Sequence, residues 1–149
     1  MGGLMALFHP SRDQVRQFFF DAWAKFQQQQ ALTDLETIAV DIIQAHPEYH
    51  HVLEAPEQYL EQSYFPEMGE TNPFLHMSLH LSVLEQVSID QPPGIHAAYH
   101  ALARKYGSVI EAQHALMDCL AEAIWQAQRS STGLDAQAYA ACIEAKARG

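Results

Sequence analysis

The chain has 149 residues, of which 48% are hydrophobic, and acidic residues outnumber basic ones 18 to 8 to give a formal net charge of −10. This length is typical of one domain, and the acidic balance excludes the basic stripe that a nucleic-acid partner would need. No apolar run is long enough to cross a membrane, and the first residues lack the basic start of a signal peptide. We therefore expect a cytoplasmic protein with one domain over residues 1–149 and a flexible N-terminus over residues 1–10.

The first predicted helix begins at a capping box, Ser11-Arg-Asp-Gln14. In such a box the serine hydroxyl accepts the amide of the fourth residue, whose side chain reaches back to the serine. We expect the helix to run to about Gln29 and to be central, because its apolar positions cover more than one-third of its surface. These positions are Val15, Phe18, Phe19, Ala22, Trp23 and Phe26.

A second capping box, Thr33-Asp-Leu-Glu36, predicts a helix that Pro47 ends. Pro47 and Pro56 each suit a first helical position, because proline there removes no helical hydrogen bond. They predict two short helical pieces, at about 47–54 and 56–62.

Residues 63–71 show no apolar period and form the longest predicted loop. Asn72-Pro73 then predicts a helix to about Ile89, because asparagine caps a helix and proline suits its first turn. The stretch Asp90-Gln-Pro-Pro-Gly94 is a clear break, and it is followed by a predicted helix over 95–106.

Gly107 ends that helix, and a third capping box at Ser108-Val-Ile-Glu111 begins a long one to about Gln128. Asp135 caps a last helix, which ends in basic residues that suit a helix C-terminus. The fold class predicted from these elements is an all-α, single-domain bundle of about five main helices plus short helical pieces.

Two cysteines, Cys119 and Cys142, lie on separate predicted helices and form no Cys-x-x-Cys pair. We expect two thiols in a reducing compartment rather than a disulfide framework. Cys119 is expected to be an inert thiol in the core.

The chain has nine histidines, and six of them form three pairs with a spacing of four residues. Residues four apart on a helix share one face, so two imidazoles so placed can reach one metal ion. The pairs are His46/His50, His76/His80 and His96/His100.

His76 and His80 lie on an apolar stripe, as does His114 on its own predicted helix, so we expect all three to point inward. Glu111 and Asp118 lie about one turn on either side of His114. Two facing helices would then present three histidines and one carboxylate to a common point. This ligand set suits Zn²⁺, Fe²⁺ or Mn²⁺ and leaves a position for water or substrate.

The other two pairs give weaker indications. The inward face of the helix over 95–106 is better formed by its apolar residues, so we expect His96 and His100 to be solvated. Pro47 interrupts the first pair and puts His46 at or before a helix cap, which leaves the geometry of His46 and His50 open.

Two known metal bundles were compared with this spacing. The ferritin-like di-iron pattern matches only at Glu111-Ala-Gln-His114. The ligand order is similar to that of hemerythrin, although here the aspartate is one residue nearer to its histidine and an extra helix intervenes. The residues in that order are His46, His50 to Glu54, His76 to His80, and His114 to Asp118.

Distinctive stretches extend over nearly the whole chain. They are Arg12-Asp-Gln with Phe18-Phe-Phe-Asp-Ala-Trp23, His46-Pro-Glu-Tyr-His50, Gly69-Glu-Thr-Asn-Pro-Phe-Leu-His76 with His80, Pro92-Pro-Gly-Ile95, Glu111-Ala-Gln-His114 and Glu122-Ala-Ile-Trp-Gln-Ala-Gln-Arg129. Together they resemble a proteobacterial family of small hypothetical proteins, a domain of unknown function. The resemblance implies a stand-alone bacterial protein and carries no activity, cofactor or partner with it.

The leading hypothesis is a metal-binding bundle in which a bound metal would activate water if the protein is catalytic; the residues indicate no substrate. The alternative is a non-enzymatic interaction or scaffold protein that uses a helix face such as Phe18, Phe19 and Trp23, for example to form a homodimer. In that case the inward histidines form only a structural polar network. A third hypothesis is an acid-responsive protein, because protonating nine histidines takes the charge from −10 toward about −1.

Overall fold

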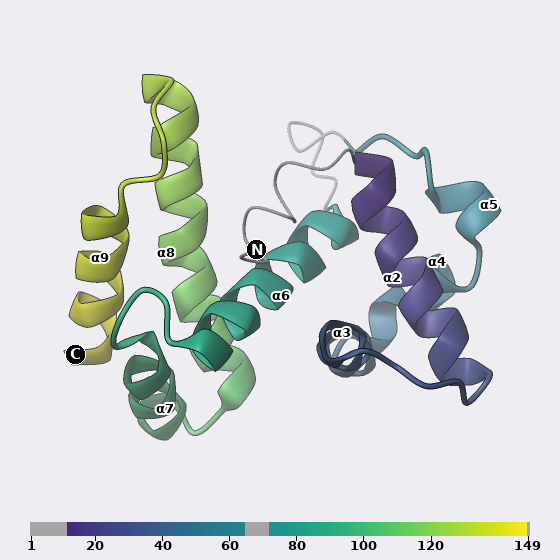
Figure 1. Cartoon of the computed structure of the whole chain (residues 1–149), viewed down its shortest axis with the longest axis horizontal. Coiled ribbons are helices and arrows are strands. Elements are labelled where there is room, and N and C mark those ends of the chain that lie inside the picture. The colour runs from purple at the N-terminus through teal and green to yellow at the C-terminus, as the bar shows by residue number, and fades with distance from the viewer. Residues whose placement is uncertain (1–11, 65–71, 149) are drawn as a thin grey trace. The chain divides into compact units, whose positions relative to one another are not determined.

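The computed structural model describes residues 12–64 and 72–148. Within these ranges all regular structure is helical, which confirms the all-α prediction (Figure 1). Six helices there have 11 or more residues, so the expected count of about five is one too low. The elements are α2 (Arg12–Gln27), α3 (Asp34–Gln44), η1 (Pro47–Tyr49), α4 (His50–Leu53), α5 (Pro56–Tyr59), α6 (Pro73–Ile89), α7 (Ile95–Tyr106), α8 (Val109–Ser130) and α9 (Ala136–Arg148).

The chain divides into two compact units, residues 1–81 and residues 82–149. The first unit holds the elements from α2 to α5 and the first half of α6. The second unit holds the rest of α6 with α7, α8 and α9. The expectation of one domain over the whole chain remains a prediction. None of the helices that the structure describes has both the length and the apolar character to span a bilayer.

Local signals place the helix ends in the first unit. Thr33 Oγ1 accepts a hydrogen bond from Glu36 N at 3.1 Å, and Thr33 N donates to Glu36 Oε1 at 2.9 Å, so the predicted capping box is confirmed. Pro47 and Pro56 occupy first-turn positions of η1 and α5, as predicted. Elements η1 and α4 together cover residues 47–53, close to the predicted 47–54, whereas α5 ends at Tyr59, short of the predicted 62. The predicted cap at Ser11, the N-terminus over 1–10 and most of the loop over 63–71 lie outside the described residues.

Side-chain oxygens accept hydrogen bonds at the starts of α6 and α7, from Asn72 as the cap of α6 and from Asp90 ahead of Gly94, the N-cap position of α7. Asn72 Oδ1 accepts from the amides of Phe74 and Leu75 at 3.0 and 3.2 Å, which confirms the Asn-Pro prediction. Asp90 Oδ1 accepts from the amides of Gly94 and His96 at 3.1 and 3.0 Å, so this side chain spans the break before α7. The sequence predicted the break but not these hydrogen bonds of Asp90.

Serine and aspartate caps begin the last two helices. Gly107 ends α7 with a left-handed φ of 68°, a conformation that glycine adopts without strain. Ser108 Oγ accepts from Glu111 N at 3.2 Å, as predicted, and Asp135 Oδ1 accepts from Ala138 N at 3.0 Å. The Glu111 side chain is positioned toward His114, so the capping box is not reciprocal.

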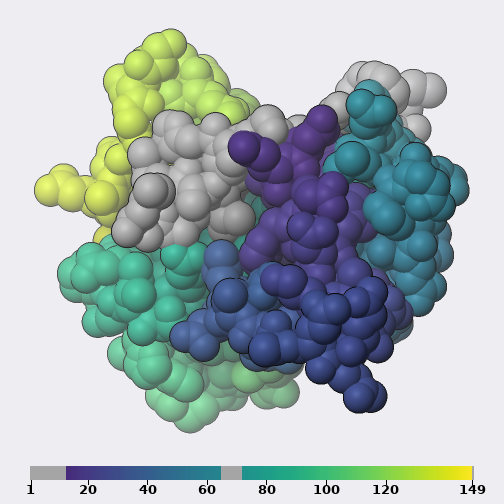
Figure 2. All heavy atoms as spheres, turned by 45° about the vertical axis from the view of Figure 1, so that its right-hand side comes forward, coloured from purple at the N-terminus to yellow at the C-terminus, as the bar shows by residue number. Residues whose placement is uncertain are grey.

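The core of the first unit forms where α2 packs against α3, and the atoms of these helices adjoin in Figure 2. Phe19 and Trp23 of α2 and Ile43 of α3 are buried there. Phe18, Phe19 and Trp23 form the helix face that the sequence suggested for a partner. This face is largely buried in the folded chain and offers little surface to a partner. The reason is that the apolar stripe of a central helix is covered by its own neighbours.

The core of the second unit forms where α7, α8 and α9 pack together. Cys119 of α8 and Cys142 of α9 form a disulfide, with 5.7 Å between their Cα atoms. The expectation of two free thiols, with an inert thiol at Cys119, is therefore wrong. The physical reason is tertiary: the two helices pack with these positions facing each other, within the Cα separation that a disulfide spans.

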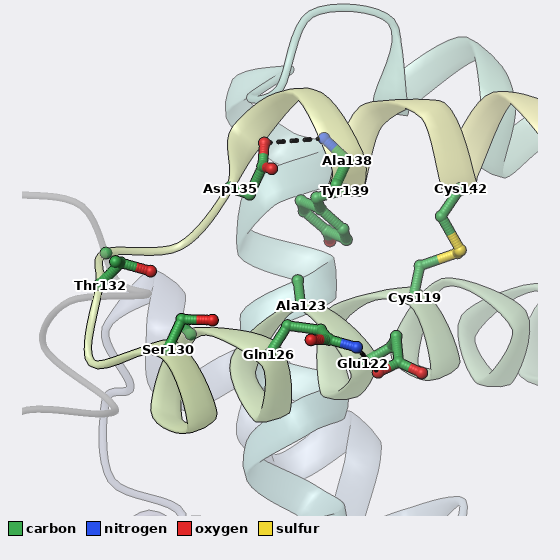
Figure 3. A pocket seen from close by; sticks show the side chains of 12 residues that line it. Cys119, Glu122, Ala123, Gln126, Ser130, Thr132, Asp135, Ala138, Tyr139 and Cys142 are labelled. Atoms are coloured by element: carbon green, nitrogen blue, oxygen red, sulfur yellow. Dashed lines mark hydrogen bonds between the residues drawn. A yellow bond between two sulfur atoms is a disulfide. The ribbon is translucent and has the colours of Figure 1, made fainter.

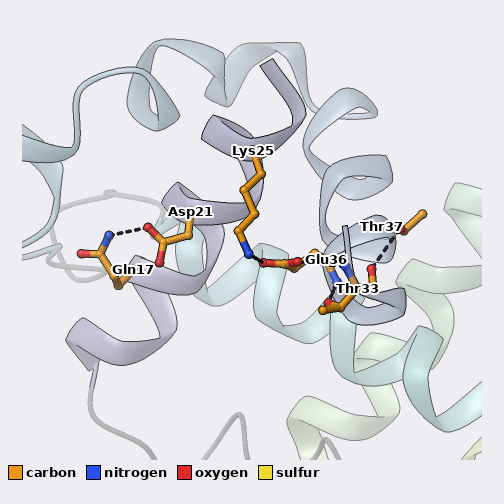
Figure 4. A network of polar contacts seen from close by, with 6 residues as sticks. All are labelled: Gln17, Asp21, Lys25, Thr33, Glu36 and Thr37. Carbon is orange, nitrogen blue, oxygen red and sulfur yellow. Dashed lines mark hydrogen bonds and ion pairs between the residues drawn. The ribbon is translucent and has the colours of Figure 1, made fainter. Parts of the chain in front are cut away.

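The ion pair between Lys25 and Glu36, drawn in Figure 4, lies in the first unit and affects how stability depends on pH. Lys25 Nζ donates to Glu36 Oε2 at 2.8 Å, and the Glu36 side chain is only 9% exposed. The hydrogen bond from Lys25 and that from the Thr33 amide hold the pKa of Glu36 below its ordinary value of 4.5. A carboxylate with a lowered folded-state pKa stabilises the fold above its ordinary pKa, and this contribution is lost as the pH falls through the folded-state value.

We therefore expect Glu36→Gln to lower the free energy of unfolding by about 1 kcal/mol at pH 7 and to cost progressively less below pH 4.5. Glutamine still suits a capping box, so the variant removes mainly the charge. Urea unfolding at pH 7 and at about pH 3 measures the difference. Glu61→Gln, at an exposed carboxylate, is the control. A Glu36→Gln cost that stays constant over this range contradicts the assignment.

Candidate metal centre

Three histidines of the first unit form a cluster. His46 precedes η1, and His76 and His80 lie one turn apart on α6. Their ring centroids are separated by 5.1 Å (His46 to His76), 4.8 Å (His46 to His80) and 4.7 Å (His76 to His80). Each ring offers a nitrogen, and these nitrogens lie within 4.8 Å of one another. The cluster therefore meets the first requirement of a metal site, which is that several ligand atoms converge.

The pair on α6 has the spacing that a shared metal ion requires. The Nε2 atoms of His76 and His80 are 3.1 Å apart. Two nitrogens bound to one ion at about 2.1 Å and at cis angles of 90–109° are about 3.0–3.4 Å apart. The same distance also fits an N–H···N hydrogen bond between two neutral imidazoles. Either arrangement requires at least one ring to direct a nitrogen lone pair into the gap.

The hydrogen bond of His46 leaves its Nε2 atom available for a metal. Its Nδ1 lies 2.8 Å from the carbonyl oxygen of Ile42, and its side chain is buried. A carbonyl oxygen only accepts, so Nδ1 carries the hydrogen and Nε2 carries the lone pair. Metal-binding histidines commonly use such a second hydrogen bond to fix ring orientation and basicity. His46 is therefore oriented as a ligand by the end of α3.

The cluster is partly buried and has an aromatic neighbour. His80 is fully buried, and the Tyr49 ring stacks on His46 at 5.3 Å between centroids. Burial, with a smaller effect of Glu48, raises the pKa of the Tyr49 hydroxyl. Tyr49 is therefore a neutral neighbour of the cluster and not an anionic ligand.

His50 is positioned away from this cluster. Its Nε2 lies 3.0 Å from the carbonyl oxygen of Ile43, and its ring packs on Trp23 at 4.9 Å. Glu54 Oε2 accepts from Gln27 instead. Pro47 begins a new helical piece between His46 and His50, so their spacing of four does not put them on one helix face. Among the described residues, His50 and Glu54 are absent from any group of possible metal ligands, unlike the hemerythrin order.

The other predicted ligands lie on α8, in the second unit. His114 is 37% exposed, and its Nδ1 lies 3.5 Å from Glu111 Oε1. Asp118 is 75% exposed and lies 3.9 Å from Lys146 Nζ. Of the two predicted carboxylate ligands, Glu111 is the one that lies beside His114, whereas Asp118 lies beside Lys146. The role of all three residues as ligands remains a prediction.

The pair on α7 provides a useful contrast. His96 and His100 are both exposed, as predicted, although their ring centroids are only 4.6 Å apart. Spacing alone therefore brings two imidazoles together. Burial and a third converging histidine distinguish the pair on α6.

His46 lies outside the ligand set predicted from the sequence, where it appeared only in the hemerythrin-like order with its geometry left open. The only signal was its position directly before Pro47, which ends one helical segment and begins another. The ring of such a residue is not held on a helix face, so spacing does not predict its direction. Its hydrogen bond with the Ile42 carbonyl, four residues earlier, fixes the ring and is seen only in the folded chain.

Comparison with protein families supports the resemblance seen in the sequence. The family model DUF1841, described as a domain of unknown function, matches residues 11–145. No curated protein and no solved structure matches the chain.

Proposed function

We propose that this chain, which belongs to the DUF1841 family, binds one divalent transition-metal ion through His46, His76 and His80. The observation that carries the proposal is the 3.1 Å separation of the Nε2 atoms of His76 and His80, beside a third imidazole whose Nδ1 is already hydrogen-bonded to a carbonyl. A polar network alone would satisfy the three rings but has no need for three converging nitrogens. The ligand set is neutral and nitrogen-rich, which suits Zn²⁺, Fe²⁺ or Mn²⁺.

His114 is proposed as a further nitrogen ligand, with Glu111 or Asp118 as a carboxylate ligand. The support is their spacing on one long helix and the position of Glu111 at 3.5 Å from His114. Three protein ligands would leave a fourth position on Zn²⁺ for water, and four would still leave positions on six-coordinate Fe²⁺ or Mn²⁺; a bound metal lowers the pKa of such a water toward neutrality. This is the chemistry that the site would supply to a hydrolytic reaction.

Elemental analysis of untagged protein, purified without a chelating resin, tests the proposal. We expect about one Zn, Fe or Mn per chain, either as purified or after loading and desalting. Single variants His46→Ala, His76→Ala and His80→Ala are expected to lose stoichiometric metal. The double variant His96→Ala/His100→Ala is the matched control, because it removes an equally spaced but exposed pair and should keep the metal.

The same measurement distinguishes the ligands on α8. If His114 is a ligand, His114→Ala weakens metal binding as strongly as His76→Ala does. Glu111→Ala and Asp118→Ala then show which carboxylate takes part. Metal below about 0.1 per chain, unchanged after loading with Zn²⁺ or Fe²⁺, overturns the proposal and leaves a hydrogen-bonded histidine network.

A further inference from the structure

The second unit contains a cavity that has no part in the proposed metal site. It has a volume of about 530 Å³ and lies between α8 and α9 (Figure 3). The disulfide of Cys119 and Cys142 lies at one end, and Ser130, Thr132 and Asp135 lie toward the other. A cavity of this size holds a small molecule. From this juxtaposition we propose that the disulfide is a thiol–disulfide exchange site for small thiols that are cationic or neutral.

The two cysteine residues differ in exposure. Cys119 is only 1% exposed, whereas Cys142 is half-buried, and both cysteines line the cavity. Exchange requires a thiolate to reach one sulfur directly. The incoming thiolate therefore attacks Cys142, forms a mixed disulfide with it, breaks the bond to Cys119 and leaves Cys119 as a thiolate that takes a proton.

A second small thiol completes the exchange. Its thiolate attacks the sulfur of the bound thiol, releases Cys142 as a thiolate that takes a proton, and leaves as a small-molecule disulfide. The net reaction oxidises two small thiols to one disulfide and reduces the protein bond to two cysteine thiols. No other oxidant or reductant is required.

Helix α9 has other contacts that hold it in place when the disulfide opens. Tyr139 and Ile143 are buried, and the Tyr139 hydroxyl donates to Gln86 Oε1 in the core of the same unit. Helix α9 also packs against both α7 and α8. Opening of the bond is therefore expected to leave the unit folded, so that exchange is reversible.

The cavity charge selects among thiols. Glu122 on α8 and Asp135, directly before α9, carry carboxylates at its wall, and no described lining residue is basic. At a separation of about 8 Å in water, each carboxylate changes the local concentration of a singly charged thiol by about twofold. We expect a cationic thiol to react about tenfold faster than an anionic one at low ionic strength, after correction for thiolate fraction.

The rate of disulfide reduction by cysteamine, 2-mercaptoethanol and 2-mercaptoethanesulfonate tests this selection. The rate for each thiol is divided by the rate at which the same thiol reduces an uncharged small-molecule disulfide, which corrects for thiolate fraction and intrinsic reactivity. The variant Glu122→Gln/Asp135→Asn should reduce the tenfold preference to below about threefold. The control variant Asp41→Asn/Glu144→Gln makes the same change in net charge at exposed positions outside the cavity and should keep most of the preference. Equal ratios in these two variants overturn selection by the cavity.

The site of attack is tested separately with cystamine, the disulfide of cysteamine. The Cys119→Ser variant, with Cys142 free, is expected to form a mixed disulfide at least tenfold faster than the Cys142→Ser variant, because Cys119 is buried. Circular dichroism shows that each variant is folded. Equal rates in the two folded variants, or wild-type reduction that occurs only at the rate of global unfolding, overturn the proposed exchange site.

Discussion

Replacing Arg16 with alanine is expected to lower the free energy of unfolding of the first unit by about 3–5 kcal/mol. Arg16 is 1% exposed, and its Nη1 donates to the carbonyl oxygens of Tyr59 at 2.9 Å, Leu60 at 3.1 Å and Gln62 at 2.7 Å. Its guanidinium also lies 4.7 Å from the centre of the Phe74 ring. The variant would leave a cavity and remove a charged donor from three carbonyl groups at the end of α5, and the loss of either kind of contact is costly.

Arg16→Lys provides the graded comparison. Lysine keeps the charge but lacks the planar group that donates in a fork and stacks on Phe74, so we expect a loss between zero and that of the alanine variant. Arg104→Ala, at an exposed position of α7, is the control and should change stability by less than about 0.5 kcal/mol. Urea unfolding followed by Trp23 fluorescence in a Trp125→Phe background reports on the first unit alone. A loss below about 1 kcal/mol for Arg16→Ala would contradict a supporting role.

Arg16 also shows which structural features sequence alone could predict. The capping box at Thr33, the Asn-Pro start of α6 and the glycine that ends α7 were all predicted correctly, because each acts within a few residues. Arg16 was not singled out, since its acceptors lie 43 to 46 residues away. Its role depends on which segment packs against α2.

The geometry of the site residues could likewise be predicted where nearby residues determine it, and not where distant segments must pack together. His76 and His80 were chosen from helical spacing and do approach each other, because spacing along one helix fixes their relative position. His46 joins them from a chain segment 30 residues earlier, and the pairing of Cys119 with Cys142 requires α8 and α9 to pack in one register. Neither juxtaposition has a local signal, so each is seen only in the folded chain.

The metal itself should stabilise the first unit strongly. At a free metal concentration 1,000-fold above the dissociation constant, a ligand that binds only the folded state adds about 4 kcal/mol to the free energy of unfolding. His46, His76 and His80 all lie in this unit, and Trp23 packs on the neighbouring His50 at 4.9 Å. We therefore expect the urea transition seen by Trp23, in the Trp125→Phe background, to move to higher urea when Zn²⁺ replaces a chelator.

The increment produced by metal, rather than stability itself, is the informative quantity. His80 is fully buried, so His80→Gln lowers stability for packing reasons whether or not a metal binds. Comparing each variant with and without Zn²⁺ cancels that cost, and His80→Gln is expected to retain an increment below about 1 kcal/mol. His96→Gln/His100→Gln should retain the full increment, since this exposed pair has the same spacing on α7. An increment of equal size in both variants would show that Zn²⁺ binds elsewhere, and no increment in the wild type would show that the three imidazoles are satisfied by hydrogen bonds alone.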